Sequence, residues 1–324
     1  MNNLVKEIFE HIAILNAHIA KQIVEDEHID DYCATPCDIA IISHDKKYVQ
    51  RDYIAKMMHQ LSEFDYMERR GEVFVLEEKW RRMLPVKAKS VSLLKEKGAY
   101  TIFLLQERLA KKFIEIAKNE SQKIDLSDLV YFIDAVDGCE GLNAIRSNAI
   151  STLNLPNQPK KIFDYNQGLG YSTTQLSSIF PKSSIYSLQT ISAFKDAYSY
   201  TINKFQRKNV EYSVDYPSEM MNKLMKEKVD LITLLNPLGI EIREIGRFLN
   251  ISKQISLEGT KMLIQSPVTN NPKNSLIAEW LGLCVDGMGG YSTIENYKVL
   301  LSQHDFEVKT VKKESNFIIA EYCP

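Results

Sequence analysis

The second half of the sequence constrains the fold most, because short apolar segments alternate there with amphipathic ones. The apolar segments predict strands at 161–165, 184–189, 210–214, 229–236, 260–266, 306–311 and 316–322. Helices are expected between them, at 172–179, 192–206, 218–226, 240–249, 275–286 and 293–303. This alternation favours a mostly parallel sheet covered on both faces. The last two strands are expected to form an antiparallel hairpin, because Lys312–Ser315 is too short for a crossover helix.

A glycine-containing turn follows the first of these strands. The strand ends near Asp164, the turn carries Gly168 and Gly170, and a helix is predicted soon after Ser172. Glycines let a ligand approach the backbone closely, and a helix N-terminus offers unpaired N–H groups. This layout is typical of a nucleotide-binding βα unit, although a simple tight turn explains the same residues.

The first part of the chain has the pattern of a winged helix. Residues 3–24 and 46–64 predict amphipathic helices, and Thr35–Asp38 is a helix-start signal between them. Tyr66–Leu76 predicts a hairpin with Arg70 and Gly71 at its turn.

The charges of this module indicate what it contacts. Nine basic and eight acidic side chains lie between Asp45 and Arg82. A DNA-binding face should be clearly positive, so nucleic acid is an unlikely partner and protein contacts are favoured.

Composition narrows the class of protein further. The chain of 324 residues has a formal net charge of −2 and five scattered cysteines, as expected for a cytoplasmic protein with reduced thiols. No second Cys/His pair follows Cys33 and Cys37 at finger spacing, so no metal site is expected. No run of 18 apolar residues predicts a membrane span.

We therefore expect three regions. Residues 1–85 form the winged-helix domain, and residues 157–324 form the α/β domain. Residues 86–156 form a helical linker that contacts a partner subunit or closes a pocket, with helices at 90–118, 126–137 and 142–153.

Together these features resemble the class I S-adenosylmethionine-dependent methyltransferases. More narrowly, they resemble the small-molecule O-methyltransferase family of caffeate-type and polyketide enzymes. Asp164–Gly170 matches the motif Asp-x-Gly-x-Gly-x-Gly except at Asn166, and Gly289–Tyr297 resembles the closing segment of that family. The resemblance implies a Rossmann-like seven-stranded methyltransferase sheet, an N-terminal winged-helix dimerisation domain, a homodimer and a small-molecule acceptor.

The resemblance also implies where S-adenosylmethionine would bind. Where the family has an acid for the ribose hydroxyls, this chain offers Gln189 or Ser187, and a neutral amide accepts more weakly than a carboxylate. Asp215 and Tyr216 would meet the adenine, and Asn236 would contact cofactor or substrate or cap a turn. The full set of expected cofactor contacts is Asp164, Asn166, Gly168, Gly170, Gln189, Asp215, Tyr216 and Asn236.

The catalytic residue is left unassigned, because the His general base of the family is missing. The region after the fourth strand, Leu234–Glu241, has no His, and no histidine lies between residues 60 and 303. Residues that could assist, each also explained by a structural role, are Tyr171, Glu241, Glu279, Asp286 and Tyr291.

Three functional hypotheses follow from these observations. The first is methyl transfer from S-adenosylmethionine to a small-molecule acceptor that needs no His base, such as a carbon, nitrogen, sulfur or already ionised hydroxyl. The second is an inactive or repurposed methyltransferase fold that binds a small molecule. The third is a regulator whose winged helix binds DNA while the α/β domain senses a metabolite.

Overall fold

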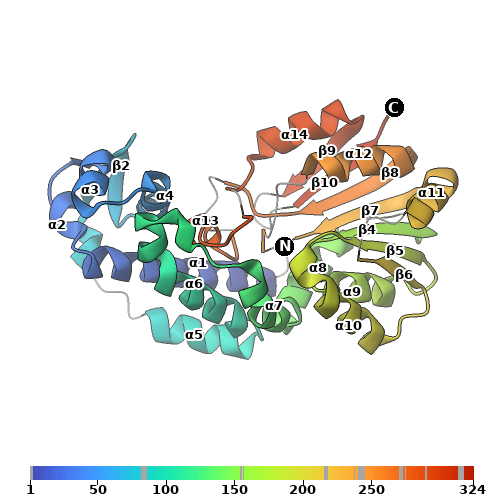
Figure 1. Cartoon of the computed structure of the whole chain (residues 1–324), viewed down its shortest axis with the longest axis horizontal. Helices are drawn as coiled ribbons and strands as arrows, with labels where there is room; N and C mark the ends of the chain where they lie inside the picture. Colours follow the sequence, from blue (N-terminus) through green and yellow to red (C-terminus); the bar gives the residue numbers. More distant parts are fainter. Residues whose placement is uncertain are drawn as a thin grey trace.

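A computed structural model describes residues 3–81, 86–153, 155, 157–214, 218–236, 238–239, 245–269, 273, 275–288, 290–312 and 317–324. Figure 1 shows a helical N-terminal half beside a C-terminal half that is built on one large sheet. The expected fold class is confirmed.

The large sheet has seven strands. Their order is β6 (Val210–Ser213), β5 (Ser184–Gln189), β4 (Lys161–Asn166), β7 (Val229–Leu235), β8 (Ser256–Gln265), β10 (Phe317–Tyr322) and β9 (Phe306–Lys312). The first five run parallel, and β10 pairs antiparallel with both β8 and β9, which confirms the terminal hairpin. Strand β8 begins earlier than expected, because Ser256 pairs with Val229 before a register shift.

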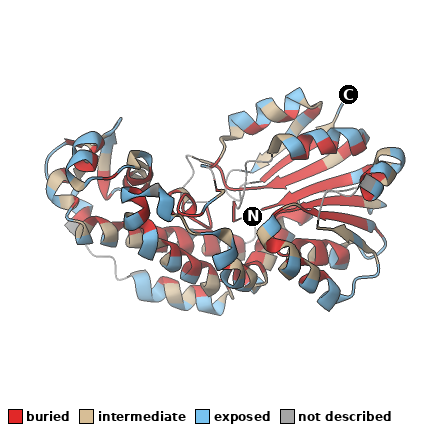
Figure 2. Cartoon of the chain, viewed as in Figure 1, coloured by how far each residue is buried: buried red, intermediate tan, exposed pale blue. Residues whose placement is uncertain are grey.

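Helices cover both faces of this sheet. One face carries α8 (Glu140–Ser151), α9 (Tyr171–Ile179) and α10 (Lys195–Phe205), and the other carries α11 (Ser218–Glu227), α12 (Ile245–Ile255) and α14 (Ile294–Gln303) (Figure 1). Adjacent strand residues face opposite ways, so Ile162 joins the cluster around Leu176 while Phe163 joins the cluster around Phe248. The inner strands β4, β5 and β7 are buried on both faces, whereas the edge strands β6 and β9 are partly exposed (Figure 2).

The N-terminal region contains the expected helices and hairpin, except that the helix expected at 46–64 begins only at Arg51, because Lys47 ends the preceding helix with a φ of +59°. Its elements are α1 (Asn3–Asp26), α2 (Asp30–Cys33), β1 (Cys37–Asp38), α3 (Ile39–Lys46), α4 (Arg51–Glu63), β2 (Met67–Arg70) and β3 (Val73–Leu76), with strand order β1-β3-β2. Asp38 caps α3 by accepting a hydrogen bond from the Ala40 N–H. The hairpin turns at Gly71, which has a φ of +66°.

The single helix expected at 90–118 is wrong, because the chain forms two helices there. Helix α5 (Val86–Glu96) ends where Gly98 adopts a φ of +61°, and α6 (Tyr100–Lys118) follows. Helix α7 (Val130–Asp137) comes next. Short 3-10 turns lie at Glu78–Arg81, Glu120–Gln122, Leu126–Leu129 and Ser192–Phe194.

Two further helix predictions need correction. The helix expected at 275–286 is only α13 (Glu279–Gly282), because Val285 leaves the helix to form a parallel bridge with Ile124. The helix expected at 240–249 begins at Ile245 and continues to Ile255; residues 240–244 lie outside the described part of the chain.

Helix α13 connects the two halves of the molecule. Trp280 packs edge-on against Phe113 with ring centroids 4.7 Å apart, and the buried apolar residues between 276 and 288 belong to the same core as α1, α4 and α6. The N-terminal core therefore contains a segment from late in the chain. Within the described residues, no helix combines the length and apolar character needed to cross a membrane.

Candidate functional site

The sheet reverses its strand order between β4 and β7. From β4 the chain builds β5 and β6 on one side, and β7 and β8 lie on the other. Ligands of open α/β sheets bind at the carboxyl ends of strands at such a switch point. Asn166 ends β4 and Asn236 follows β7, so the fold brings these expected residues to that edge. Asp215 and Tyr216 lie outside the described residues.

Asp164 lies beneath the turn and binds the chain itself. Its carboxylate is 0% exposed and accepts hydrogen bonds from the hydroxyls of Thr173 and Thr233, both at 2.7 Å. Burial raises the pKa of this carboxyl, and the donated hydrogen bonds oppose that rise. The side chain thus joins β4, β7 and the first turn of α9.

Asn166 and Gln189 lie opposite one another in the parallel pair β4–β5. The Asn166 amide donates to the Ser172 hydroxyl at 2.7 Å and accepts from the Gly168 N–H at 2.8 Å. The Gln189 amide donates to the Gly168 carbonyl and accepts from the Ile191 N–H at 2.7 Å. Both amides therefore bind the glycine turn rather than project away from it.

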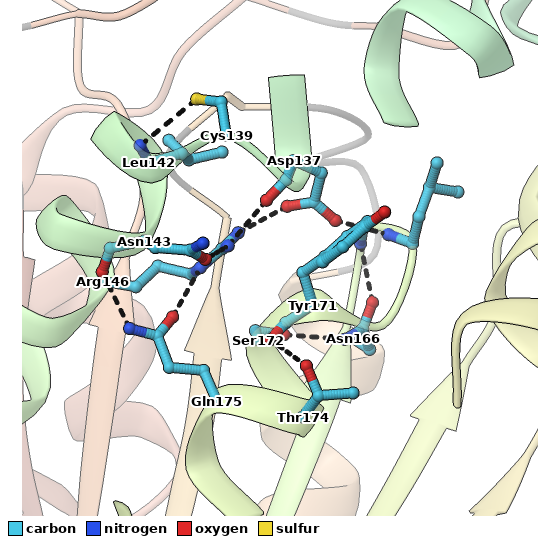
Figure 3. Close-up of polar contacts among 12 residues, drawn as sticks. Asp137, Cys139, Leu142, Asn143, Arg146, Asn166, Tyr171, Ser172, Thr174 and Gln175 are labelled. Atoms are coloured by element: carbon cyan, nitrogen blue, oxygen red, sulfur yellow. Dashed lines mark hydrogen bonds and ion pairs between the residues drawn. The ribbon is translucent and has the colours of Figure 1, made fainter. Parts of the chain in front are cut away.

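A buried ion pair, Asp137 and Arg146, contacts the same turn (Figure 3). The Asp137 carboxylate accepts from the Leu169 N–H at 2.7 Å and from the Arg146 guanidinium. Arg146 also donates to the Asp137 carbonyl at 2.7 Å, to Asn143 at 2.6 Å and to Gln175 at 3.0 Å. A side chain at Gly168 would meet Asp137, since a Cβ there would lie 2.6 Å from the carboxylate. This packing explains why the position needs glycine.

The burial and the hydrogen bonds of these residues show whether S-adenosylmethionine could bind to them in this arrangement. Gln189 is 0% exposed, Asn166 2% and Asn236 4% in the chain without ligand, and the Asn236 amide donates to Gln167 at 2.8 Å. A ribose or carboxylate can bind buried polar groups that already pair with one another only by breaking those bonds. Their hydrogen bonds are made within the chain. In this arrangement, the described residues at the switch point do not fit the cofactor.

A separate cleft of about 310 Å³ lies between α4 and the segment around α13; we call it the α4–α13 cleft. It adjoins the switch point, because a Cβ at Gly239, in the loop after β7, would lie 2.7 Å from the ring of the cleft residue Tyr291. The cleft is lined by Asp52, Ala55, Lys56, His59, Gln60, Arg69, Val268, Thr269, Ser275, Ala278, Glu279, Trp280 and Tyr291.

Glu279 is the central acid of the cleft, and its carboxylate is already well satisfied. It accepts from the Lys56 ammonium at 2.7 Å, from the Thr269 hydroxyl at 2.9 Å and from the Tyr291 N–H at 2.9 Å. Burial, and then the charge of Glu279, raise the pKa of the Tyr291 phenol. Hydrogen bonds within the chain thus fix Glu279 and Tyr291, and the Tyr291 phenol stays protonated at neutral pH.

Gln60 provides an unsatisfied donor in the cleft. The side chain is 1% exposed, and its Oε1 accepts from the Trp280 indole N–H at 2.6 Å. An indole N–H can only donate, which fixes the amide orientation and leaves Nε2 as a donor. Among the described residues, that Nε2 has no hydrogen-bond partner. Sequence reasoning missed both Gln60 and Lys56, although their four-residue spacing puts them on one face of α4.

The other candidates for catalysis lie apart or are engaged. Tyr171 donates to Asp134 at 3.1 Å, and Asp286 is exposed. Glu241 lies outside the described residues. His59 is the one histidine lining the cleft in the described chain, and burial, with the charge of Arg69, lowers its pKa. No described cluster of His, Cys, Asp and Glu could hold a metal ion.

Comparison with known proteins supports the fold. No family model and no curated protein matches the sequence. Among solved structures, the CurJ carbon methyltransferase is 17% identical with a TM-score of 0.68, covering 100% of this chain and 94% of its own. The DszA carbon methyltransferase is 14% identical with a TM-score of 0.60, covering 99% and 93%. An O-methyltransferase family 2 protein from Planctomyces limnophilus in complex with apigenin is 14% identical with a TM-score of 0.55, covering 98% and 96%. The resemblance is thus confirmed at the level of the fold, and this chain has the fold of carbon and oxygen methyltransferases.

Proposed function

We propose that this chain binds a small molecule in the α4–α13 cleft, using a methyltransferase fold for recognition. This is the second of the three sequence hypotheses. The observation that carries it is the Gln60 amide, a buried donor without a described partner in the wall of a cleft large enough for a small ligand. A buried donor left unpaired costs about 1–3 kcal/mol. A ligand oxygen that accepts from Gln60 would recover that loss.

The charges of the cleft indicate what kind of ligand it suits. Gln60, Lys56 and Arg69 offer hydrogen-bond donors, whereas the Glu279 carboxylate is occupied by three donors of the chain. Trp280 and Tyr291 add aromatic surface. A site of this kind suits a small molecule with an apolar body and a carboxylate or similar oxygen acceptor.

A thermal-shift screen of aromatic and aliphatic carboxylates tests this proposal. Each acid is paired with its neutral primary amide, and hits are titrated by calorimetry. We expect acids to stabilise the protein and their amides to do so less, because Lys56 and Gln60 both donate to the acid. Stabilisation follows mass action, and about 100 times the Kd of ligand gives about 2.7 kcal/mol.

Gln60→Glu is the matched variant. It keeps an oxygen for the Trp280 indole and replaces the donor NH₂ by a negative charge, so affinity for acids should fall at least about tenfold. Lys309→Met is the control, because Lys309 pairs with Glu307 on an exposed face of β9. Equal affinity of the hits for wild type and Gln60→Glu would show that they bind elsewhere.

Methyl transfer from S-adenosylmethionine to a small-molecule acceptor, without a His base, is the second candidate function. The match to two carbon methyltransferases favours it, because a carbon acceptor that arrives as an enolate has already lost its proton and needs no His base during transfer. Under this candidate, the acceptor would occupy the α4–α13 cleft and the expected cofactor residues would have to open. Saturable binding of S-adenosylhomocysteine by the wild-type chain would favour it.

A homodimer formed through the N-terminal region stays a prediction. Ile41 and Val49 are 53% and 69% exposed there and offer apolar surface. Light scattering on the full chain should give twice the mass of one chain, and a single-chain mass at about 10 µM would contradict the prediction.

A further inference from the structure

We propose that the cofactor position of this fold is closed by two of the chain's own amide side chains, Asn166 and Gln189. They end the neighbouring strands β4 and β5 and are paired in register. Both point to the glycine turn between β4 and α9, where their hydrogen bonds replace those of a nucleoside ligand. The α4–α13 cleft plays no part in this inference, so the acid screen and the cofactor titration below can fail independently.

Gln189 links the end of β5 to the glycine turn. Its Nε2 donates to the Gly168 carbonyl, and its Oε1 accepts from the Ile191 N–H at 2.7 Å. The amide lies 3.5 Å from the Asn166 Oδ1, and the residue is 0% exposed. The buried Oε1 already accepts one backbone N–H, so this amide has at most one acceptor site left, whereas a carboxylate can accept from both hydroxyls of a ribose.

Asn166 satisfies the turn from the β4 side. Its Oδ1 accepts the Gly168 N–H at 2.8 Å, and its Nδ2 donates to the hydroxyls of Ser172 at 2.7 Å and Thr173 at 3.0 Å. The next N–H of the turn, from Leu169, is bound by Asp137 at 2.7 Å. Two successive N–H groups and one carbonyl of the turn are therefore bound by side chains of the chain itself.

The closure has a direct consequence for ligands. An incoming cofactor must break the bonds of Asn166 and Gln189 while both are buried. Glycine at 166 would free the Gly168 N–H. A carboxylate at 189 cannot donate to the Gly168 carbonyl, and it can accept from two hydroxyls. Replacing Asn166 by Gly and Gln189 by Asp together should therefore open the cofactor position.

Calorimetric titration of S-adenosylhomocysteine into the full-length chain tests this inference. We expect no saturable heat for wild type at about 1 mM ligand and at least about tenfold tighter, saturable binding for Asn166→Gly/Gln189→Asp. Asn166→Gly/Gln189→Leu is the matched control: it removes the same amides without adding an acceptor and should not bind. Micromolar binding by wild type, no binding by a folded double variant, or equal binding by the leucine control would each overturn the inference.

Amide hydrogen exchange tests the closure without relying on the double variant folding. In wild type, the Gly168 and Leu169 amides should both be protected. Asn166→Gly alone should speed exchange at Gly168 and leave Leu169 protected, because Asp137 still accepts from it. Rapid exchange at Gly168 in wild type would refute the hydrogen bond on which the closure depends.

Discussion

The buried pair of Asp137 and Arg146 should be among the polar contacts of the described chain that are most costly to break. Their side chains are 7% and 1% exposed, and the guanidinium has four acceptors: the carboxylate and carbonyl of Asp137, Asn143 and Gln175. Replacing Arg146 by Met keeps most of the apolar volume. It leaves a buried carboxylate that keeps the Leu169 N–H as a donor, and it removes the guanidinium donor from Asn143 and Gln175.

The expected cost follows from this uncompensated charge. Breaking a buried ion pair by removing one partner costs about 3–5 kcal/mol, against a total stability of about 5–15 kcal/mol for a typical domain. Urea unfolding followed by circular dichroism measures the loss as a lower midpoint at constant slope. Arg70→Met is the control, because Arg70 pairs with Glu68 at the surface with 74% of its side chain exposed. That variant should lose less than about 1 kcal/mol.

A double-mutant cycle distinguishes pairing from simple packing. Asp137→Asn/Arg146→Met removes both charges, so it should cost clearly less than the sum of the two single variants. The reasoning is refuted if Arg146→Met costs less than about 1 kcal/mol, or if the two single losses add.

Three further predictions concern packing, pH and thiol reactivity. Gly141→Ala should lower the free energy of unfolding by about 1–3 kcal/mol, because the new Cβ would lie 2.6 Å from the Ala99 side chain. Gly246→Ala in α12 adds a Cβ in open space and should raise that free energy by up to about 1 kcal/mol; thermal melts of the two variants test both changes. Folding lowers the pKa of His59 below its unfolded value of 6.5, so the free energy of unfolding should fall as pH drops below about 6.5. His59→Gln should reduce the difference in that free energy between urea titrations at pH 7 and pH 5, and an unchanged difference would contradict this. Cys323 is exposed, whereas Cys284 is buried and its pKa is raised to about 12, so an aromatic disulfide reagent should react fast with the Cys323 thiol. Cys323→Ser should abolish this fast reaction phase, and Cys284→Ser should leave it unchanged.

The sequence predicted the sheet because its signal is local. A strand buried on both faces reads as a short apolar run wherever it lies, and the connection after β9 is too short for any pairing but a hairpin. The helix-start signal at Asp38 and the turn at Gly71 are equally local. The errors at Gly98 and around Val285 arose where one backbone angle, or a bridge to a distant residue, ended a helix that the pattern would continue.

The candidate site depends on contacts that no local pattern contains. Lys56 meets Glu279 across 223 positions of sequence, and Gln60 meets Trp280 across 220. The sequence located Asn166 and Gln189 at a ligand-binding edge, since Asn166 directly follows one predicted strand and Gln189 ends the next. Only the register of β4 and β5 put the two amides against the same turn, where they satisfy its backbone. The sequence by itself therefore determined the fold and the edge where a ligand would bind, because strand and helix periodicity is local. Tertiary packing decided which polar groups are occupied there, because hydrogen-bond partners come from strands and helices far apart in the chain.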